Sequence, residues 1–165
     1  MLAGETGIRE TEGKSLLFLK SCFEGGLPHG EEKAQTGFEG FYDGFSVHAY
    51  AEGGAPESTK KFSTKSKIES LHAFLVEHEG ASPVPIWATE WGYSLEDSEA
   101  VRAAYVEKGV RMLDTQFPYL EGWAYYQLHD TVNAPAEKEE NFGLLNHGFE
   151  PRLSFAAFEA GMLAG

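Results

Sequence analysis

The sequence predicts an α/β fold with a parallel sheet, and two observations carry this prediction. Apolar stretches rich in β-branched and aromatic residues recur roughly every 40 residues, with amphipathic helical patterns between them, which is the spacing of βα units with right-handed crossovers. The apolar stretches are also nearly continuous, as in parallel strands that are covered on both faces. We therefore expect a parallel sheet buried between two layers.

The expected strands are bounded by glycine, proline or charged residues, which commonly end strands. One is a short stretch at the start of the sequence, and three longer stretches follow it. The four are Met1–Gly4, Phe41–Tyr50, Val84–Trp91 and Gly122–Leu128.

Two of the expected helices have clear end signals. Thr64–Glu79 keeps the three- and four-residue spacing of one apolar face, with Ser63 or Thr64 as the N-cap and Gly80 at its end. Ser15–Glu24 has a shorter apolar face and stops at a pair of glycines.

Two further helices are expected in the second half of the sequence. The pattern over Leu95–Thr115 predicts a helix that opens at Ser94, with Asp97 completing a weak capping box. The last helix follows Pro151, because proline is well suited to a first helical turn.

Length, composition and charge restrict the class of protein. With 165 residues, of which 42% are hydrophobic and 13% aromatic, the sequence suits one globular domain. Its 26 acidic and 13 basic residues give a formal charge of −13, which disfavours nucleic acid and anionic membranes as partners. No apolar run is long enough to span a membrane, and the start lacks the order of a secretory signal. The lone Cys22 excludes an internal disulfide and does not indicate a compartment.

Chemically useful side chains gather where the expected strands end. His48 and Tyr50 close the second strand, Glu90 and Trp91 close the third, and Tyr126-Gln127 lies near the end of the fourth. Parallel strands of βα units bring their carboxyl ends to one edge of the sheet, where binding and catalytic residues usually lie. Aromatic faces stack on sugar rings, and carboxylate, imidazole and amide groups hydrogen-bond hydroxyls. This mixture predicts a saccharide pocket.

Glu90 has two interpretations from its surroundings alone. A carboxylate at the end of an apolar strand is costly to desolvate unless it is hydrogen-bonded or used in chemistry. A structural hydrogen bond or ion pair would satisfy Glu90 as well as a catalytic role would. His48 is more often a core histidine when it stands alone, but Tyr50 two positions on points the same way and favours the pocket.

Several segments together resemble the retaining glycoside hydrolases with (β/α)8 barrels, the superfamily of cellulases, mannanases, xylosidases and related hydrolases. Residues 85–92 (PIWATEWG) look like the seventh-strand motif whose glutamate is the nucleophile. Residues 41–50 (FYDGFSVHAY) resemble the sixth strand, whose His and Tyr line the adjacent subsite, and residues 123–130 resemble the eighth. Residues 142–145 and 150–158 are similar to the closing loop and last helix.

The resemblance implies half of a (β/α)8 TIM barrel, strands five to eight, forming one partial domain over residues 1–165. It assigns Glu90 as the catalytic residue and His48, Tyr50, Trp91, Tyr126 and Gln127 as substrate-binding residues. Trp123 is expected in the core, because it stands at the start of its strand. The family's acid/base glutamate follows an asparagine at the end of the fourth strand, and this sequence has no Asn-Glu pair. Glu5 is interpreted as a loop residue rather than a replacement.

Because retaining hydrolysis needs two carboxyl groups, we expect the chain alone to be inactive and to require a partner. The expected partners are a carbohydrate substrate and either an N-terminal half-barrel or a second copy of the chain. The alternatives are a saccharide-binding or pairing half-barrel without catalysis, and a truncated gene product. No cofactor is implied, and the histidine spacing predicts no metal site. The sequence does not indicate the compartment, and a secreted complete protein is one of the alternatives.

Overall fold

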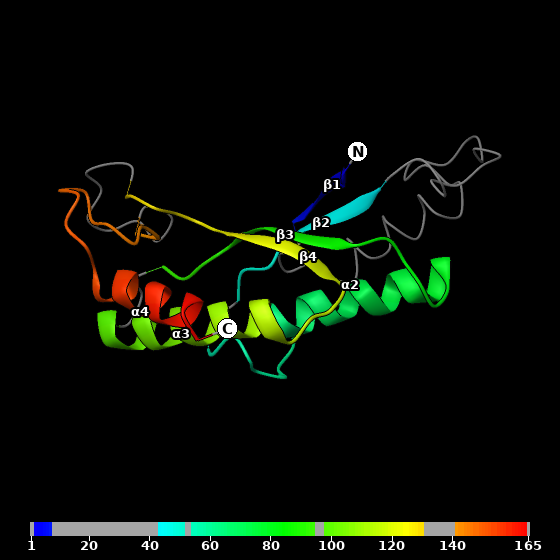
Figure 1. Ribbon diagram of the computed structural model, residues 1–165, viewed down its shortest axis with the longest axis horizontal. Coiled ribbons are helices and arrows are strands. Elements are labelled where there is room, and N and C mark those ends of the chain that lie inside the picture. Colours follow the sequence, from blue (N-terminus) through cyan, green and yellow to red (C-terminus); the bar gives the residue numbers. More distant parts are fainter. Residues whose placement is uncertain (1, 8–42, 52–53, 95–97, 131–140, 165) are drawn as a thin grey trace.

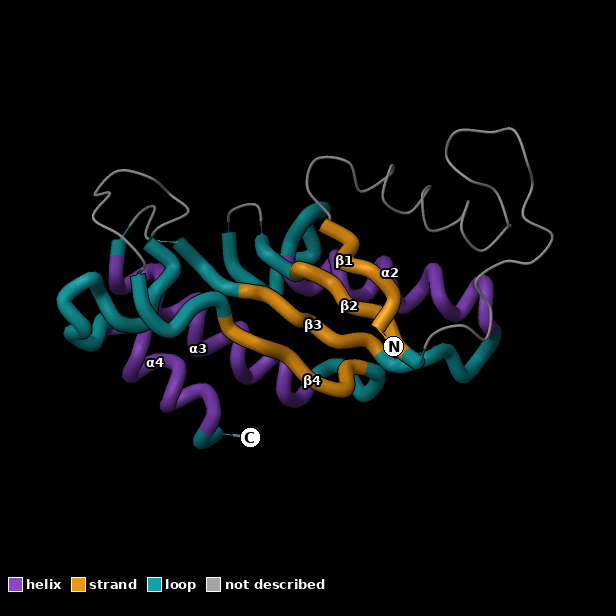
Figure 2. Tube along the Cα trace, turned by 90° about the horizontal axis from the view of Figure 1, so that it is seen from above, coloured by secondary structure: helices purple, strands orange, loops and turns teal. Residues whose placement is uncertain are grey.

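The computed structural model describes residues 2–7, 43–51, 54–94, 98–130 and 141–164. Four parallel strands form one sheet in which the spatial order follows the chain order (Figures 1 and 2). This confirms an α/β fold with a parallel sheet. The strands are β1 (Leu2–Gly7), β2 (Gly44–His48), β3 (Ile86–Trp91) and β4 (Leu120–Tyr125).

The strands lie at the predicted places, with shifted ends. β1 continues past the predicted end at Gly4, so Glu5 lies within a strand, opposite Ser46 of β2, and not in a loop as predicted. β4 begins earlier than predicted and ends at Tyr125, so Tyr126 and Gln127 lie just beyond the strand.

The helix α2 (Thr64–Glu79) has the bounds that the sequence predicted. The Ser63 hydroxyl accepts a hydrogen bond from the Ser66 backbone N–H at 3.0 Å, which satisfies a donor of the first turn. Gly80 ends the helix with a φ of 88°, a conformation that glycine adopts without a steric cost.

The starts of the two later helices differ from the predictions. α3 (Glu99–Thr115) is capped by Ser98, whose hydroxyl accepts from the Val101 backbone N–H at 3.2 Å. The predicted opening at Ser94 is therefore wrong, because the helix begins only after the later serine. α4 (Leu153–Met162) follows Arg152 as its N-cap, so Pro151 precedes the helix instead of occupying its first turn. The helix predicted over Ser15–Glu24 lies outside the described residues.

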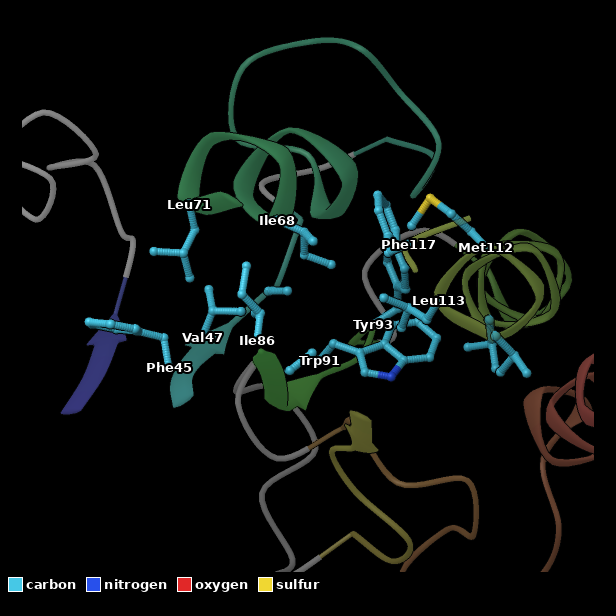
Figure 3. Close-up of a cluster of buried hydrophobic side chains, with 14 of the residues drawn as sticks. Phe45, Val47, Ile68, Leu71, Ile86, Trp91, Tyr93, Met112, Leu113 and Phe117 are labelled. Carbon is cyan, nitrogen blue, oxygen red and sulfur yellow. The ribbon is translucent and has the colours of Figure 1, made fainter. Parts of the chain in front are cut away.

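The described helices all lie on one side of the sheet (Figure 1). Between the two layers, side chains of β2 and β3 meet those of α2 and α3 (Figure 3). The largest members of this core are almost completely buried; they include Phe45, Val47, Ile68, Leu71, Leu75, Ile86, Trp91, Val106, Val110, Met112 and Leu113.

None of the described helices covers the opposite face of the sheet, which we call the open face (Figure 1). Trp87 of β3 is 37% exposed there and packs beside Gly122 of β4. The prediction of a sheet covered on both faces is therefore not met by the described residues. No helix among them is long and apolar enough to cross a membrane.

Candidate active site

The carboxyl ends of β2, β3 and β4 meet at one edge of the sheet. The backbone N–H of Ala49 donates to the Glu90 carbonyl at 2.8 Å, and the N–H of Tyr126 donates to the Trp91 carbonyl at 2.8 Å. His48 of β2 pairs in register with Glu90 of β3. The three strand ends are thus held together by main-chain hydrogen bonds, and their side chains share one edge.

A β-bulge in β3 decides which way Glu90 points. Trp87 and Glu90 are three positions apart, yet they pair with Ser46 and His48 of β2, which are two apart. Ala88 and Trp91 are likewise three apart and pair with residues of β4 that are two apart. Both pairings place one extra residue in β3 between Ala88 and Glu90. Such an insertion reverses the alternation of faces beyond it, so Glu90 joins the open face although the strictly alternating pattern of Ile86 and Ala88 would have turned it toward the helices.

The carboxylate of Glu90 is held by two neighbours from β2 and its continuation. The Tyr50 hydroxyl donates to Oε2 of Glu90 at 2.8 Å, and Nδ1 of His48 lies 3.4 Å from the same oxygen. His48 and Tyr50 reach one oxygen because residues two apart in an extended segment face the same side. The Glu90 side chain is 35% exposed, so it remains accessible to a ligand.

Burial, and then the hydrogen bond to Glu90, raise the pKa of Tyr50 well above its ordinary value. Both effects disfavour the phenolate, because an anion there would lose solvation and would face the carboxylate. Tyr50 is therefore a stable hydroxyl donor at neutral pH and fixes the orientation of the Glu90 carboxylate.

Aromatic rings stand beside this pair. The rings of Tyr50 and Tyr126 make an edge contact with centroids 6.1 Å apart. Phe142 contacts both, at 5.4 Å from Tyr50 and 5.7 Å from Tyr126. The predicted site residue Tyr126 is thus brought to the Tyr50–Glu90 pair, and Phe142 joins it.

Gln127 follows Tyr126 across a cis peptide bond. Its backbone carbonyl accepts from the Leu144 N–H at 3.0 Å, so the main chain here is tied to the segment that precedes α4. Its Nε2 is buried and has no hydrogen-bond partner among the described residues. A buried amide donor without a partner is unfavourable.

Trp91 is not a sugar-binding ring, in contrast to the sequence prediction. It is 0% exposed, and its ring points toward α3 (Figure 3). The ring makes edge contacts with Trp123 and Tyr125. A Cβ at Gly109 of α3 would lie 2.4 Å from this ring, so glycine is what lets the helix approach. The bulge that turns Glu90 outward turns Trp91 into the core. The predicted core position of Trp123 agrees with its packing against that core.

Sequence reasoning missed the side-chain role of Phe142 and the ionic groups behind it. The sequence identifies residues 142–145 only as part of a closing loop. Arg102 reads as an ordinary helix-surface cation in the sequence, yet it is 2% exposed and donates to the Phe142 carbonyl at 2.6 Å. No local sequence signal marks such a contact, because it joins residues 40 positions apart. Within the described ranges, no group of three or more His, Cys, Asp or Glu side chains is arranged to hold a metal ion.

No protein-family model and no curated protein matches this sequence. Solved structures do match its fold. A family 39 glycoside hydrolase from Bacteroides cellulosilyticus has a TM-score of 0.57 and 24% identity, with 74% of this chain and 28% of that chain covered. A GH2 beta-galacturonidase from Eisenbergiella tayi has a TM-score of 0.58 and 13% identity, with 74% and 24% covered.

A monomeric beta-xylosidase from Caulobacter crescentus has a TM-score of 0.51 and 21% identity, with 74% of this chain and 28% of that chain covered. The described chain therefore spans about a quarter of the length of these structures. At these identities the comparisons show that the parallel sheet and its helices have the fold of part of a glycoside hydrolase.

Proposed function

We propose that this chain carries the nucleophile side of a retaining glycosidase site, with Glu90 as the nucleophile. The observation that carries the proposal is the cluster at the edge of the sheet, in which Tyr50 donates to Glu90 at 2.8 Å and His48 lies 3.4 Å from the same oxygen. A half-exposed carboxylate with one oxygen fixed by a hydroxyl donor is oriented for attack at a carbon atom above the edge.

In the proposed step, a carboxylate oxygen of Glu90 forms a bond to the anomeric carbon while the bond from that carbon to the leaving oxygen breaks. The electron pair goes to the leaving oxygen, which takes a proton from an acid, and the sugar is left as an ester of Glu90. Water then attacks the anomeric carbon and loses a proton to the conjugate base of that acid, while the bond to Glu90 breaks and the carboxylate is regenerated, which gives net retention. The acid is not assigned to a residue of this chain.

The substrate class follows from the lining of the site. Tyr126 offers an aromatic face and Gln127 an unpartnered buried amide, a combination that suits the apolar face and the hydroxyls of a sugar ring. His48 and Tyr50 would contact the sugar bound next to Glu90. The glycosidase fold of the structural neighbours supports this substrate class. As part of the same proposal, β1 to β4 correspond to strands five to eight of a barrel of the cellulase and mannanase superfamily.

A partner for the open face is also part of the proposal. Trp87 is 37% exposed on a sheet face that no described helix covers, and parallel sheets are normally covered on both faces. An N-terminal half-barrel would cover this face and bring the acid. A second copy of the chain is the alternative, and its charge of −13 per chain would oppose pairing at low salt.

The test uses 2,4-dinitrophenyl glycosides, because their phenolate leaves without a proton and the missing acid does not matter. We expect a burst of about one equivalent of dinitrophenolate per chain, as a covalent intermediate requires. Glu90→Gln should abolish the burst, and Glu121→Gln, which removes an exposed carboxylate from β4, should leave it unchanged. A burst that survives in Glu90→Gln would overturn the proposal. Saccharide binding without any burst would instead favour a binding module.

A further inference from the structure

We propose that Phe142 is a positioning residue for the Tyr50–Glu90 pair and that a partly buried ionic clasp holds it there. The clasp consists of Arg102, Asp130, Arg152 and Glu99. The catalytic meaning of this inference rests on the proposed function of Glu90, whereas the positioning itself can be measured without any activity.

The ring of Phe142 contacts the rings of Tyr50 and Tyr126. Phe142 meets Tyr50 edge to face, with centroids 5.4 Å apart and planes at 74°, and it meets Tyr126 at 5.7 Å and 67°. Because Tyr50 and Tyr126 also touch each other, the three rings form a closed triangle. Phe142 therefore limits the movement of the Tyr50 ring, whose hydroxyl is the donor to Glu90.

The backbone of Phe142 is anchored by hydrogen bonds from side chains. One guanidinium nitrogen of Arg102 donates to the carbonyls of Phe142 and Gly143, each at 2.6 Å. The Tyr125 hydroxyl donates to the Phe142 carbonyl as well, at 3.3 Å. Arg102 is 2% exposed, and charge-assisted hydrogen bonds of this kind are stronger than neutral ones.

Asp130 links Arg152 to the same backbone segment. Asp130, also 2% exposed, accepts from the Gly143 N–H at 2.6 Å and from Arg152 at 2.6 Å. A Cβ at Gly143 would lie 2.4 Å from the Asp130 backbone nitrogen, so only glycine allows this approach.

Glu99 completes the network, because one of its oxygens accepts from Arg152 at 2.9 Å and lies 3.7 Å from Arg102. Two cations and two anions thus join the chain after β4, the start of α3 and the start of α4 around one short segment.

The energetics favour a role in geometry over a role in stability. Desolvating two ion pairs offsets much of their attraction, so apolar residues of similar volume would often stabilise a fold as well. An ionic network does, however, fix hydrogen-bond directions that apolar packing leaves free. The clasp ends at the carbonyl of Phe142, whose ring contacts both Tyr50 and Tyr126, so the geometry that the clasp fixes is the geometry of the candidate site.

The test compares Phe142→Ala with Phe149→Ala, which removes a 68% exposed ring from the same segment. Tyrosine labelled with carbon-13 at Cζ is titrated by NMR, and Tyr50→Phe assigns the Tyr50 signal. We expect Tyr50 to ionise at lower pH in Phe142→Ala than in the wild type, because the ring becomes more exposed. Phe149→Ala should match the wild type, and Phe142→Tyr should restore its behaviour.

Arg102→Lys is the second variant, because lysine keeps the charge but lacks the planar fork. It should shift the Tyr50 titration in the same direction while the protein stays folded by circular dichroism. The dinitrophenolate burst rate should fall roughly ten- to a hundredfold in both variants, which is the usual penalty for a small misplacement. An unchanged Tyr50 titration in folded Phe142→Ala and Arg102→Lys would overturn the positioning role. A wild-type chain without a burst, but with the shifted titration in the variants, would reject the glycosidase function and keep the positioning role.

Discussion

The two faces of the central sheet are built for different purposes. On the helix side, Val47, Ile86, Ala88 and Trp91 are all 0% exposed. On the open side, Trp87 is 37% exposed and the Glu90 and His48 side chains are 35% and 19% exposed. Among the described residues, the apolar packing of these strands therefore lies on the helix side, whereas the polar groups of the candidate site lie on the other side, where they avoid the cost of burial in a core.

The boundary between the two environments runs through adjacent residues of β3. Glu90 and Trp91 are neighbours in sequence, yet one is an accessible carboxylate and the other is a core ring. Because β3 contains one extra residue before Glu90, both side chains point to the faces opposite to those that regular alternation from Ile86 would give. The rigid packing of Trp91 against α3 therefore fixes the strand from which Glu90 projects.

Truncating a tryptophan on each face gives the largest expected contrast. Trp91→Ala should lower the free energy of unfolding by about 3 to 5 kcal/mol, because it opens a large cavity in the core. Trp87→Ala should cost less than half as much, since its ring is partly solvated already. Urea unfolding followed by circular dichroism measures both. Equal losses would show that the open face is as well packed as the core.

Breaking the clasp should have the next largest effect. Asp130→Ala leaves Arg152 without its closest anion and should cost about 3 kcal/mol, as for other buried ion pairs that lose one partner. The control is Glu57→Ala, which breaks the exposed pair with Lys108 at 2.8 Å and should cost less than about 1 kcal/mol. The urea unfolding midpoints of the two variants, each compared with the wild type, measure the two losses of stability. A similar small loss in both would mean that the clasp is no stronger than a surface pair.

Tyr50→Phe should have the smallest effect on stability, at most about 1.5 kcal/mol at neutral pH for one lost hydrogen bond, but it should lower the burst rate. The pH dependence carries a sign. Because the pKa of Tyr50 is raised in the folded state, its contribution is fully present below about pH 10, the ordinary tyrosine value, and is lost as the pH rises above it.

Wild type should therefore lose more stability than Tyr50→Phe between about pH 9 and pH 11, as measured by urea unfolding at each pH. Other tyrosines, such as the partly buried Tyr119, whose pKa burial raises to about 12, titrate in both proteins and cancel in the difference. Parallel losses in the two proteins would contradict the buried hydrogen bond of Tyr50.

The sequence predicted the elements better than the directions of the side chains. α2 has its predicted bounds because Ser63 and Gly80 are strong, local end signals. His48, Tyr50 and Glu90 meet as expected because parallel strands end at one edge. The start of α3 was wrong because Ser94 and Ser98 are both plausible caps, and only packing chooses between them.

The direction of Trp91 and the burial of Arg102 had no local signal. A bulge between Ala88 and Glu90 leaves no mark that composition or periodicity reveals, and strict alternation from Ile86 predicts the opposite faces. Arg102 finds its partners in a segment 40 residues away. Both features depend on how distant elements come together, so the structure was needed to find them.

The most direct test of the central claim is the position of a covalent label. The chain is incubated with 2-deoxy-2-fluoro glycosyl fluorides of xylose, glucose and galactose, which form slowly hydrolysed esters and carry a leaving group that needs no acid. Tandem mass spectrometry of the digested protein then locates the sugar. We expect a label on Glu90, in the peptide that contains Trp87 and Trp91. A label on Glu5, Glu96 or Glu99 with Glu90 unmodified would contradict it.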